Sequence, residues 1–370
     1  MRISIIAGAR PNFMKVAPIM HAIRRWNESV SGNGVLSPIL VHTGQHYDVM
    51  MSEVFFRELG IPEPDINLEV GSGSHAKQTA AIMARFEDVC LEHRPDWVVV
   101  VGDVNSTMAC TLVAAKLGIR VAHVEAGLRS FDRTMPEEIN RVVTDALADL
   151  LLTPSPDADS NLLREGVPET RIHRVGNIMI DTLVANLDKA RSCRTYERFG
   201  VDPGRYVYVT LHRPSNVDQP DILRGILNDL MDLSRSFPVI FPMHPRTRKN
   251  MEAFGIRLNT GPHFQVVDPV GYHDSLCLAE NARFVLTDSG GLQEETTYFR
   301  TPCLTLRPNT ERPVTVTEGS NRLTSPATLW ADIKDLLEKP SRFGRVPDLW
   351  DGRTAERVLN ALTHYGSAEP

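Results

Sequence analysis

The chain has 370 residues, of which 42% are hydrophobic and 23% charged, a composition typical of a globular protein whose length favours two domains. No apolar run approaches the roughly 18 residues that a membrane helix requires, and a formal net charge of -6 argues against nucleic acid as the main partner. The five cysteines are odd in number and scattered through apolar segments, which is typical of a reducing compartment. We therefore expect a soluble, cytoplasmic protein, and no Cys or His spacing suggests a metal site.

Short apolar strands alternate with amphipathic helices in the first half of the chain. We expect strands at 2–8, 96–103, 120–125 and 149–155, and helices at 13–26, 106–118 and 136–148. The order strand, helix, strand predicts a parallel sheet, and runs such as "WVVVV" are typical of strands covered by helices on both faces. These features indicate a doubly wound, Rossmann-like domain over residues 1–172.

The same rhythm restarts after about residue 170. We expect strands at 206–212, 238–244, 263–267, 282–288 and 301–307, with a long helix at 220–236. They predict a second Rossmann-like domain over 173–352, followed by a helix within 353–370 that can pack back on the first domain. The expected fold class is α/β, with two Rossmann-like domains, parallel sheets covered by helices and a central cleft.

Polar residues follow several predicted strands directly, which is where open parallel sheets bind ligands. The stretch "TDSGG" follows a strand and precedes a helix, so the backbone N–H groups of Ser289, Gly290 and Gly291 would favour a phosphate at the helix N-terminus. Glu295, one turn further on, could accept ribose hydroxyl groups. The alternatives are an N-cap in a tight turn and a solvated carboxylate.

Two cations in "GARPNFMK" follow the first strand in the same way. Arg10 lies in the predicted loop and Lys15 near the start of the next helix, where both could face a diphosphate. Two ordinary surface cations are the alternative. The chain has neither GxGxxG after its first strand nor a P-loop, so bound NAD and a P-loop kinase lose their usual support. We expect no cofactor.

Carboxylates form the most informative set in the first domain. Asp103 and Glu125 each end a predicted strand, and Glu137 opens the helix "PEEINRVV". Acid and base chemistry needs such groups, but Asp103 could instead help to start a helix. Glu137 could form a capping box with Thr134 and an i,i+4 ion pair with Arg141. No local helix start explains Glu125.

Two histidines end strands of the second domain at equivalent positions. His212 lies in "TLHRPSN" and His244 in "FPMHPRT", and an arginine follows each of them. A structural role is the ordinary interpretation of a single histidine. The pair also suits contact with a phosphate or general acid catalysis.

Eight motifs in register between residue 5 and about residue 325 resemble the non-hydrolysing UDP-N-acetylglucosamine 2-epimerases. They are "GARPNFMK", "HTGQHYD", "GDVNST", "HVEAGLRS", "MPEEINR", "LHRPSN", "TDSGGLQEE" and "NTERP". The resemblance implies an isomerase with a fold like that of GT-B glycosyltransferases, which binds a nucleotide sugar between two Rossmann-like domains. It also implies a homodimer and a role in cell-surface polysaccharide biosynthesis.

The resemblance also implies a role for each matching residue. UDP contacts fall on Arg10, Lys15, His212, Ser289, Gly290, Gly291, Glu295 and Arg312. Sugar contacts or acid and base duties fall on Asp103, Glu125, Glu137 and Arg141. A residue near Ser275 would bind uracil, largely through its backbone. The first loop and the histidine motif read "RPNF" and "HRPSN" where many family members have acidic residues, but neither departure removes an implied ligand.

The implied reaction interconverts UDP-GlcNAc and UDP-ManNAc by elimination of UDP to a 2-acetamidoglucal and its re-addition. We assign Asp103 and Glu137 to the two faces of C2, with Glu125 assisting and His212 as a further acid/base candidate. The alternatives are a 2-epimerase of a related UDP-sugar such as UDP-2,3-diacetamido-glucuronic acid, a GT-B glycosyltransferase and a regulatory protein that binds a UDP-sugar. Which UDP-sugar is the substrate stays open at this point.

Overall fold

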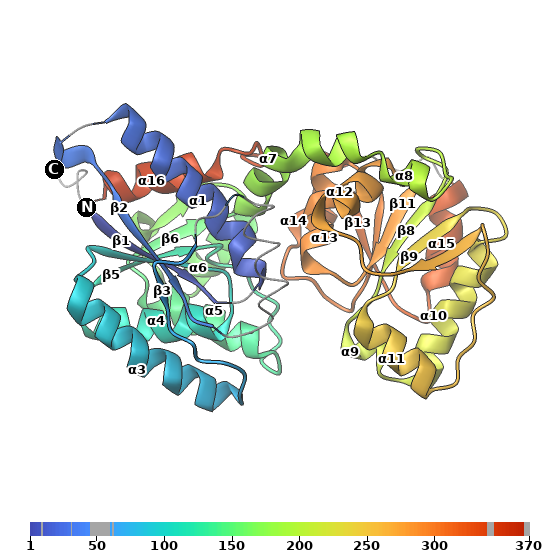
Figure 1. Ribbon diagram of the computed structural model, residues 1–370, viewed down its shortest axis with the longest axis horizontal. Helices are drawn as coiled ribbons and strands as arrows, with labels where there is room; N and C mark the ends of the chain where they lie inside the picture. Colours follow the sequence, from blue (N-terminus) through green and yellow to red (C-terminus); the bar gives the residue numbers. More distant parts are fainter. Residues whose placement is uncertain (9, 31, 45–59, 61–62, 339–343, 366–370) are drawn as a thin grey trace. The chain divides into compact units, whose positions relative to one another are not determined.

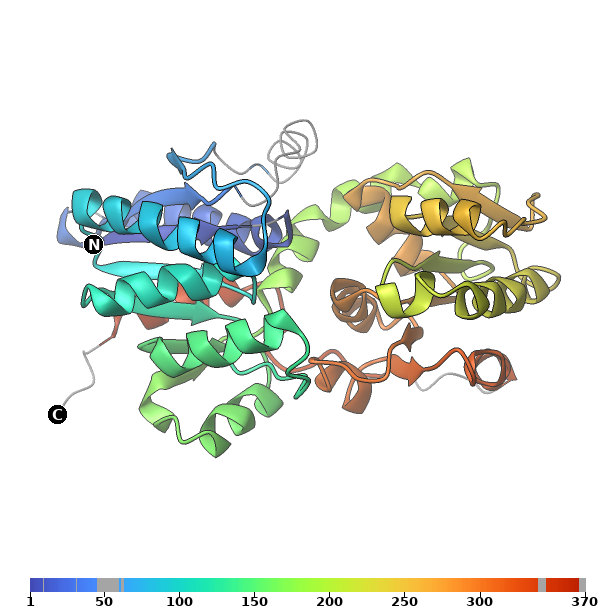
Figure 2. The same ribbon diagram turned by 90° about the horizontal axis from the view of Figure 1, so that it is seen from below.

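The computed structural model describes residues 1–8, 10–30, 32–44, 60, 63–338 and 344–365. Contacts within the chain divide it into unit 1, Met1–Val184 with Asp348–Pro370, and unit 2, Ala185–Pro347. The division falls inside the helix α7 (Ile178–Cys193), further along the chain than the boundary expected at residue 172. Each unit is a parallel sheet with helices packed on it (Figures 1 and 2), so the expected α/β fold class is confirmed.

Unit 1 contains a seven-stranded sheet in the order β3-β2-β1-β4-β5-β6-β7, and every pair of neighbours is parallel. Its strands are β1 (Arg2–Ala7), β2 (Ser37–His42), β3 (Ile66–Asn67), β4 (Trp97–Val101), β5 (Arg120–Val124), β6 (Leu150–Thr153) and β7 (Ile172–Arg174). All five residues of β4 are buried, as the "WVVVV" run predicts for a central strand with both faces covered. The core of this unit therefore lies on both sides of β1, β4 and β5.

Helices cover both faces of this sheet (Figure 1). They are α1 (Arg10–Ser29), α3 (His75–His93), α4 (Asn105–Lys116), α5 (Pro136–Leu147), α6 (Pro156–Arg164) and α16 (Thr354–Thr363), with 3-10 turns η1 (Gly32–Gly34) and η2 (Glu169–Arg171). Helix α16 packs against α1, and the backbone N–H groups of Thr354 and Ala355 donate to the buried Asp181 carboxylate on α7. The end of the chain thus belongs to unit 1.

In its described residues, unit 2 repeats the order of the first six strands of unit 1. Its sheet runs β10-β9-β8-β11-β12-β13, all parallel. The strands are β8 (Val207–Thr210), β9 (Val239–Pro242), β10 (Phe264–Val267), β11 (Phe284–Thr287), β12 (Cys303–Leu306) and β13 (Asn321–Thr324). In both units the order reverses between the first strand and the fourth, and such a switch point is where doubly wound sheets bind ligands.

The helices of unit 2 begin directly after its strands in several places. They are α8 (Thr195–Arg198), α9 (Pro214–Val217), α10 (Pro220–Leu233), α11 (Pro245–Ala253), α12 (Tyr272–Asn281), α13 (Gly290–Phe299), α14 (Val314–Thr317) and α15 (Leu329–Glu338). Leucine and isoleucine side chains of α10 and α15 pack against the sheet in one buried cluster. Each such fully buried side chain stabilises the fold by roughly 2 kcal/mol, so the strand ends rest on a rigid base.

Within the described ranges, no helix has both the length and the apolarity needed to cross a lipid bilayer. The described residues also contain no group of three His, Cys, Asp or Glu side chains placed to hold a metal ion. All five cysteines are described and unpaired, and four of them are buried.

Candidate active site

Asp103 follows β4 at the switch point of unit 1, and Arg141 of α5 holds its side chain. The Asp103 carboxylate accepts hydrogen bonds from Arg141 Nε at 3.1 Å and from Arg141 Nη2 at 2.6 Å. Its side chain is 27% exposed, whereas that of Arg141 is 3% exposed. Helix α4 takes Val104 as its N-cap, so Asp103 does not cap that helix. The carboxylate is therefore fixed by a buried cation and remains open to solvent.

Glu125 and Lys15 form a buried ion pair beside it. The Lys15 ammonium donates to Glu125 Oε2, and both side chains are less than 10% exposed. Glu125 has φ +71°, the left-handed region that non-glycine residues rarely adopt. Such backbone strain is concentrated at functional sites. The loop between β4 and Asp103 leaves no room for a side chain at Gly102, because a Cβ there would lie 2.6 Å from Lys15 Nζ.

Glu137 is exposed at the start of α5, and its neighbour Glu138 occupies the structural position. The capping box expected for Glu137 does not form, since α5 takes Met135 as its N-cap without a side-chain hydrogen bond. Arg141 Nη1 donates to Glu138 Oε2 at 2.7 Å, so the expected i,i+4 pair with Glu137 is replaced by an i,i+3 pair. Both local structural explanations of Glu137 are wrong.

Sequence reasoning missed the role of Glu138. This carboxylate is buried and accepts hydrogen bonds from the backbone N–H groups of Ser130 and Phe131 and from the Ser130 hydroxyl group, each at 2.9 Å. Burial alone would raise the pKa of Glu138, but these hydrogen bonds and Arg141 outweigh it and lower the pKa. Glu138 therefore stays ionised and helps to hold Arg141 against Asp103.

Unit 2 presents the expected turn between β11 and α13. Ser289 is the N-cap of α13 but makes no capping bond with its side chain, and Gly290 and Gly291 are the first helical residues. Arg312 lies against this turn, because a Cβ on Gly290 would be 3.2 Å from Arg312 Nη1. The turn therefore offers a helix N-terminus, which is suited to an anion. The adjacent guanidinium group of Arg312 is itself paired with Glu294 and Glu311.

Asp288 organises this turn and was not among the predicted site residues. Its buried carboxylate accepts hydrogen bonds from the backbone N–H groups of His212 and Arg213 and from Asn216 Nδ2. His212 Nδ1 lies 2.9 Å from Asp288 Oδ1. Because the carboxylate accepts the Nδ1 hydrogen, His212 presents Nε2 to a ligand. The only sequence signal for Asp288 was its place in the "DSGG" motif.

His244 lies beside His212, with ring centroids 5.5 Å apart. The Arg246 backbone N–H donates to His244 Nδ1 at 3.1 Å, which leaves the hydrogen of the neutral ring on Nε2. The two histidines therefore follow the neighbouring strands β8 and β9 and lie side by side.

Glu295 is buried on α13, one turn beyond the anion-binding position. Burial and the neighbouring Glu294 raise the pKa of Glu295 to about 8, and Tyr272 opposes the rise. The carboxyl group is therefore largely protonated at neutral pH, so it can donate as well as accept a hydrogen bond.

Two predicted residues have placements that narrow their roles. Arg10 is the first residue of α1 and does not lie in the loop before it. The Ser275 N–H donates to the Gly271 carbonyl within α12, and its hydroxyl group lies 2.9 Å from the Tyr208 hydroxyl group. Contact between Ser275 and a base would therefore use other atoms.

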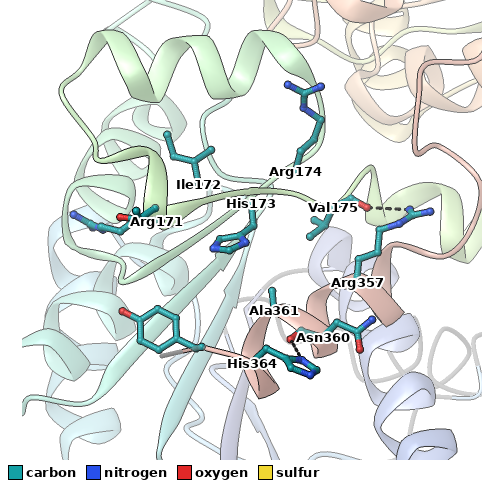
Figure 3. A pocket seen from close by; sticks show the side chains of 11 residues that line it. Arg171, Ile172, His173, Arg174, Val175, Arg357, Asn360, Ala361 and His364 are labelled. Atoms are coloured by element: carbon teal, nitrogen blue, oxygen red, sulfur yellow. Dashed lines mark hydrogen bonds between the residues drawn. The ribbon is translucent and has the colours of Figure 1, made fainter. Parts of the chain in front are cut away.

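A cavity of about 1000 Å³ lies elsewhere, between β7 and α16 (Figure 3). It is lined by arginines and histidines, but Arg174 pairs with Asp159 and Arg357 pairs with Asp351. None of the predicted site residues lines it. Its cations are thus already neutralised in part, and it is not the candidate active site.

Comparison with known proteins places the chain in a family. The model of the UDP-N-acetylglucosamine 2-epimerase family matches residues 28–363. A relative from Methanocaldococcus jannaschii, named UDP-N-acetylglucosamine 2-epimerase, is 41% identical over 98% of this chain and 99% of its own. Its crystal structure in complex with UDP-GlcNAc and UDP has a TM-score of 0.84, covering 99% of this chain and 100% of that one.

A Pseudomonas aeruginosa relative is named UDP-2,3-diacetamido-2,3-dideoxy-D-glucuronate 2-epimerase. It is 42% identical over 88% of this chain and 89% of its own. The fold is that of a doubly wound α/β protein with carboxylates at the ends of its parallel strands. The chain belongs to the UDP-N-acetylglucosamine 2-epimerase family, whose members are isomerases of UDP-sugars, and the resemblance inferred from its motifs is confirmed.

Proposed function

We propose that this protein is a non-hydrolysing UDP-N-acetylglucosamine 2-epimerase that interconverts UDP-GlcNAc and UDP-ManNAc. The observation that carries the proposal is the group formed by Asp103, Arg141 and Glu137 in unit 1. One carboxylate is held by a buried guanidinium group, and a second, exposed carboxylate lies on the same helix as that guanidinium group. Inversion at C2 needs an acid or base on each face of the sugar, and this group supplies both.

The reaction starts with removal of the C2 proton by one carboxylate. The electron pair of the C2–H bond forms a C1=C2 double bond, and UDP leaves with the electrons of the C1–O bond. UDP then adds back to C1 of the 2-acetamidoglucal while the second carboxyl group protonates C2 on the opposite face. We assign Asp103 and Glu137 to these two steps, and the strained, ion-paired Glu125 to orienting Lys15 and the Asp103 loop. No redox cofactor takes part in this scheme.

Unit 2 would hold the nucleotide. The helix N-terminus at Ser289, Gly290 and Gly291, with Arg312 beside it, would stabilise the charge that develops on the leaving diphosphate. Each well-aimed donor contributes a few kcal/mol in comparable sites. His244 would donate from Nε2, and His212, held by Asp288 at Nδ1, would lie beside it. Glu295 would bind the ribose, and a residue near Ser275 would bind uracil, as the family resemblance implies. From unit 1, Arg10 and Lys15 would add positive charge.

The test is incubation of the purified protein with UDP-GlcNAc alone, followed by NMR. Formation of UDP-ManNAc without an acceptor supports the proposal. Release of free ManNAc and UDP would instead show a hydrolysing enzyme, and activity only with an acceptor would show a glycosyltransferase. A second candidate substrate is the diacetamido-glucuronate sugar in the name of the Pseudomonas aeruginosa relative. The same incubation should therefore be run with a panel of UDP-sugars that contains it.

We also propose that the protein acts as a homodimer in the cytoplasm, in the synthesis of a cell-surface polysaccharide. The family resemblance supports the dimer and the pathway, and the five free cysteines suit a reducing compartment. Light scattering on the eluting protein would measure its mass, and a monomer at micromolar concentration would contradict the dimer.

A further inference from the structure

The buried His123 of β5 joins the strand-end loops of unit 1. Its side chain is 0% exposed. His123 Nε2 lies 2.8 Å from the Gly102 carbonyl oxygen, and His123 Nδ1 lies 2.6 Å from Asp145 Oδ1 on α5. The Gly102 carbonyl belongs to the peptide that leads into Asp103. A planar peptide fixed at its oxygen fixes the direction of the residue that follows.

Both nitrogens of His123 face acceptors. A carbonyl oxygen can only accept, so Nε2 carries a hydrogen. Burial alone would raise the pKa of Asp145, but His123 and Arg129 outweigh it and lower the pKa, so Asp145 is a carboxylate. The second contact, between Nδ1 and Asp145 Oδ1, holds the other end of the ring. The ring is therefore fixed at both ends.

Asp145 extends the connection to the loop after β5. Its Oδ2 accepts hydrogen bonds from the Gly127 N–H at 3.0 Å and from Arg129 Nη1 at 2.7 Å. Arg129 in turn donates to both carboxylate oxygens of Glu165, at 2.8 and 2.7 Å. Gly127 stands two residues after Glu125. The His123–Asp145 pair thus contacts the loop that carries Asp103, the loop that carries Glu125 and the helix that carries Glu137.

We propose that His123, held between Asp145 and the Gly102 carbonyl, is a positioning residue that fixes the Gly102–Asp103 peptide and so aims the Asp103 carboxylate at the substrate. The proposal rests on the proposed function, because it assigns a part of that reaction to His123. The residue does not touch the substrate. Its effect should appear in turnover and not in nucleotide binding, since the residues proposed to hold UDP belong mostly to unit 2.

Two substitutions separate the two ends of the ring. In His123→Gln the amide nitrogen replaces Nε2 and keeps a donor for the Gly102 carbonyl. In His123→Asn it replaces Nδ1 and keeps only the contact with Asp145. We expect kcat to fall about 100-fold in the Asn variant and less than about tenfold in the Gln variant, because a displacement of about 1 Å costs that much in comparable sites. KM should stay within about twofold in both.

Equal losses of kcat in the two variants would overturn the positioning role. So would losses of kcat that are proportional to the decrease in each variant's melting temperature. Ring ¹⁵N NMR of the wild-type protein tests the contact with the Gly102 carbonyl directly. The Nε2 signal of His123 should show a bound hydrogen, because a carbonyl oxygen can only accept. An Nε2 without a hydrogen would contradict the proposal.

Failure of the proposed function is a separate outcome. If the wild-type protein turns over no UDP-sugar of the panel, crystal structures of the two variants would show whether His123 orients the Gly102–Asp103 peptide. The Gly102–Asp103 peptide should keep its wild-type orientation in the Gln variant and rotate in the Asn variant. The same orientation in both would overturn the inference.

Discussion

The Asp288 carboxylate lies 2.9 Å from His212 Nδ1 and also accepts hydrogen bonds from the backbone N–H groups of His212 and Arg213. One buried acid therefore fixes both the loop after β8 and the tautomer of the histidine in it. Burial alone would raise the pKa of Asp288, but the hydrogen bond to His212 and the other donors outweigh it and lower the pKa. The acid is ionised throughout the neutral range.

Asp288→Asn should lower kcat by about 10- to 100-fold and reduce stability by about 2 kcal/mol, because hydrogen bonds to a buried carboxylate are lost and the His212 tautomer is no longer fixed. Steady-state kinetics and urea unfolding would measure the two effects. Asp268→Asn is a suitable control, since Asp268 is an exposed carboxylate of the same unit that pairs with Arg248. Wild-type kcat in Asp288→Asn would refute the role of the pair.

The adjacent Glu137 and Glu138 should respond in opposite ways to the same substitution. Glu137→Gln removes an exposed carboxylate, so we expect an unchanged melting temperature and loss of most turnover. Glu138→Gln removes one partner of the buried pair with Arg141 and should cost about 3 kcal/mol of stability. Thermal unfolding and turnover measured on both variants would check this. A stable, inactive Glu138→Gln together with an active Glu137→Gln would exchange the two assignments.

In heavy water, the product should carry solvent deuterium at C2. The abstracted proton sits on an exposed carboxyl group and can exchange before the other face of the glycal is protonated. Mass spectrometry and NMR of the recovered UDP-sugar would detect it. Retention of the original hydrogen at C2, or a requirement for added NAD, would rule out elimination by two bases.

The phosphate site predicts a graded response to UDP. Ser289→Ala should weaken the binding of UDP by a few fold only, because the backbone donors of the turn remain. Arg10→Ala should weaken it more, by about tenfold or beyond, because it deletes a charge-assisted contact. Calorimetric titration with UDP would measure both affinities. Unchanged affinity in both variants would show that UDP binds elsewhere.

The raised pKa of Glu295 predicts that stability falls with rising pH. The unfolded chain releases this proton near pH 4.5 and the folded chain only near pH 8, so folding retains the proton in between. The contribution is full below pH 4.5 and is lost as the pH rises toward 8. Glu295→Gln should therefore gain stability relative to wild type between these limits, on the order of 3 kcal/mol.

Denaturant unfolding of wild type and Glu295→Gln at pH 5 and pH 8 would measure this difference. Glu252→Gln changes an exposed carboxylate of the same unit and serves as the control. If the curves of wild type and Glu295→Gln run parallel across this range, the buried carboxyl group is not protonated at neutral pH.

Most strand ends could be predicted from the sequence, because buried parallel strands appear as short apolar runs and the polar residue after each run marks its end. The role of Glu138 could not, since adjacent helical residues differ by about 100° around the axis and the inward one depends on where α5 begins. The contact of Asp288 with His212 joins residues 76 apart in the sequence. It follows from the pairing of β8 with β11, which local patterns do not specify.

The first six strands of unit 1 have the same order as the six strands of unit 2. In each unit the fourth strand along the chain leads into a turn with a proposed role, at Asp103 in unit 1 and at Ser289 in unit 2. The same type of fold thus carries the proposed acid and base residues in unit 1 and the proposed nucleotide-binding residues in unit 2. Such modularity lets each half diversify without disturbing the other. We expect changes of sugar preference among relatives to accumulate in the turns after β4 and β5, while the turns after β8 and β11 stay constant because UDP is common to all the substrates.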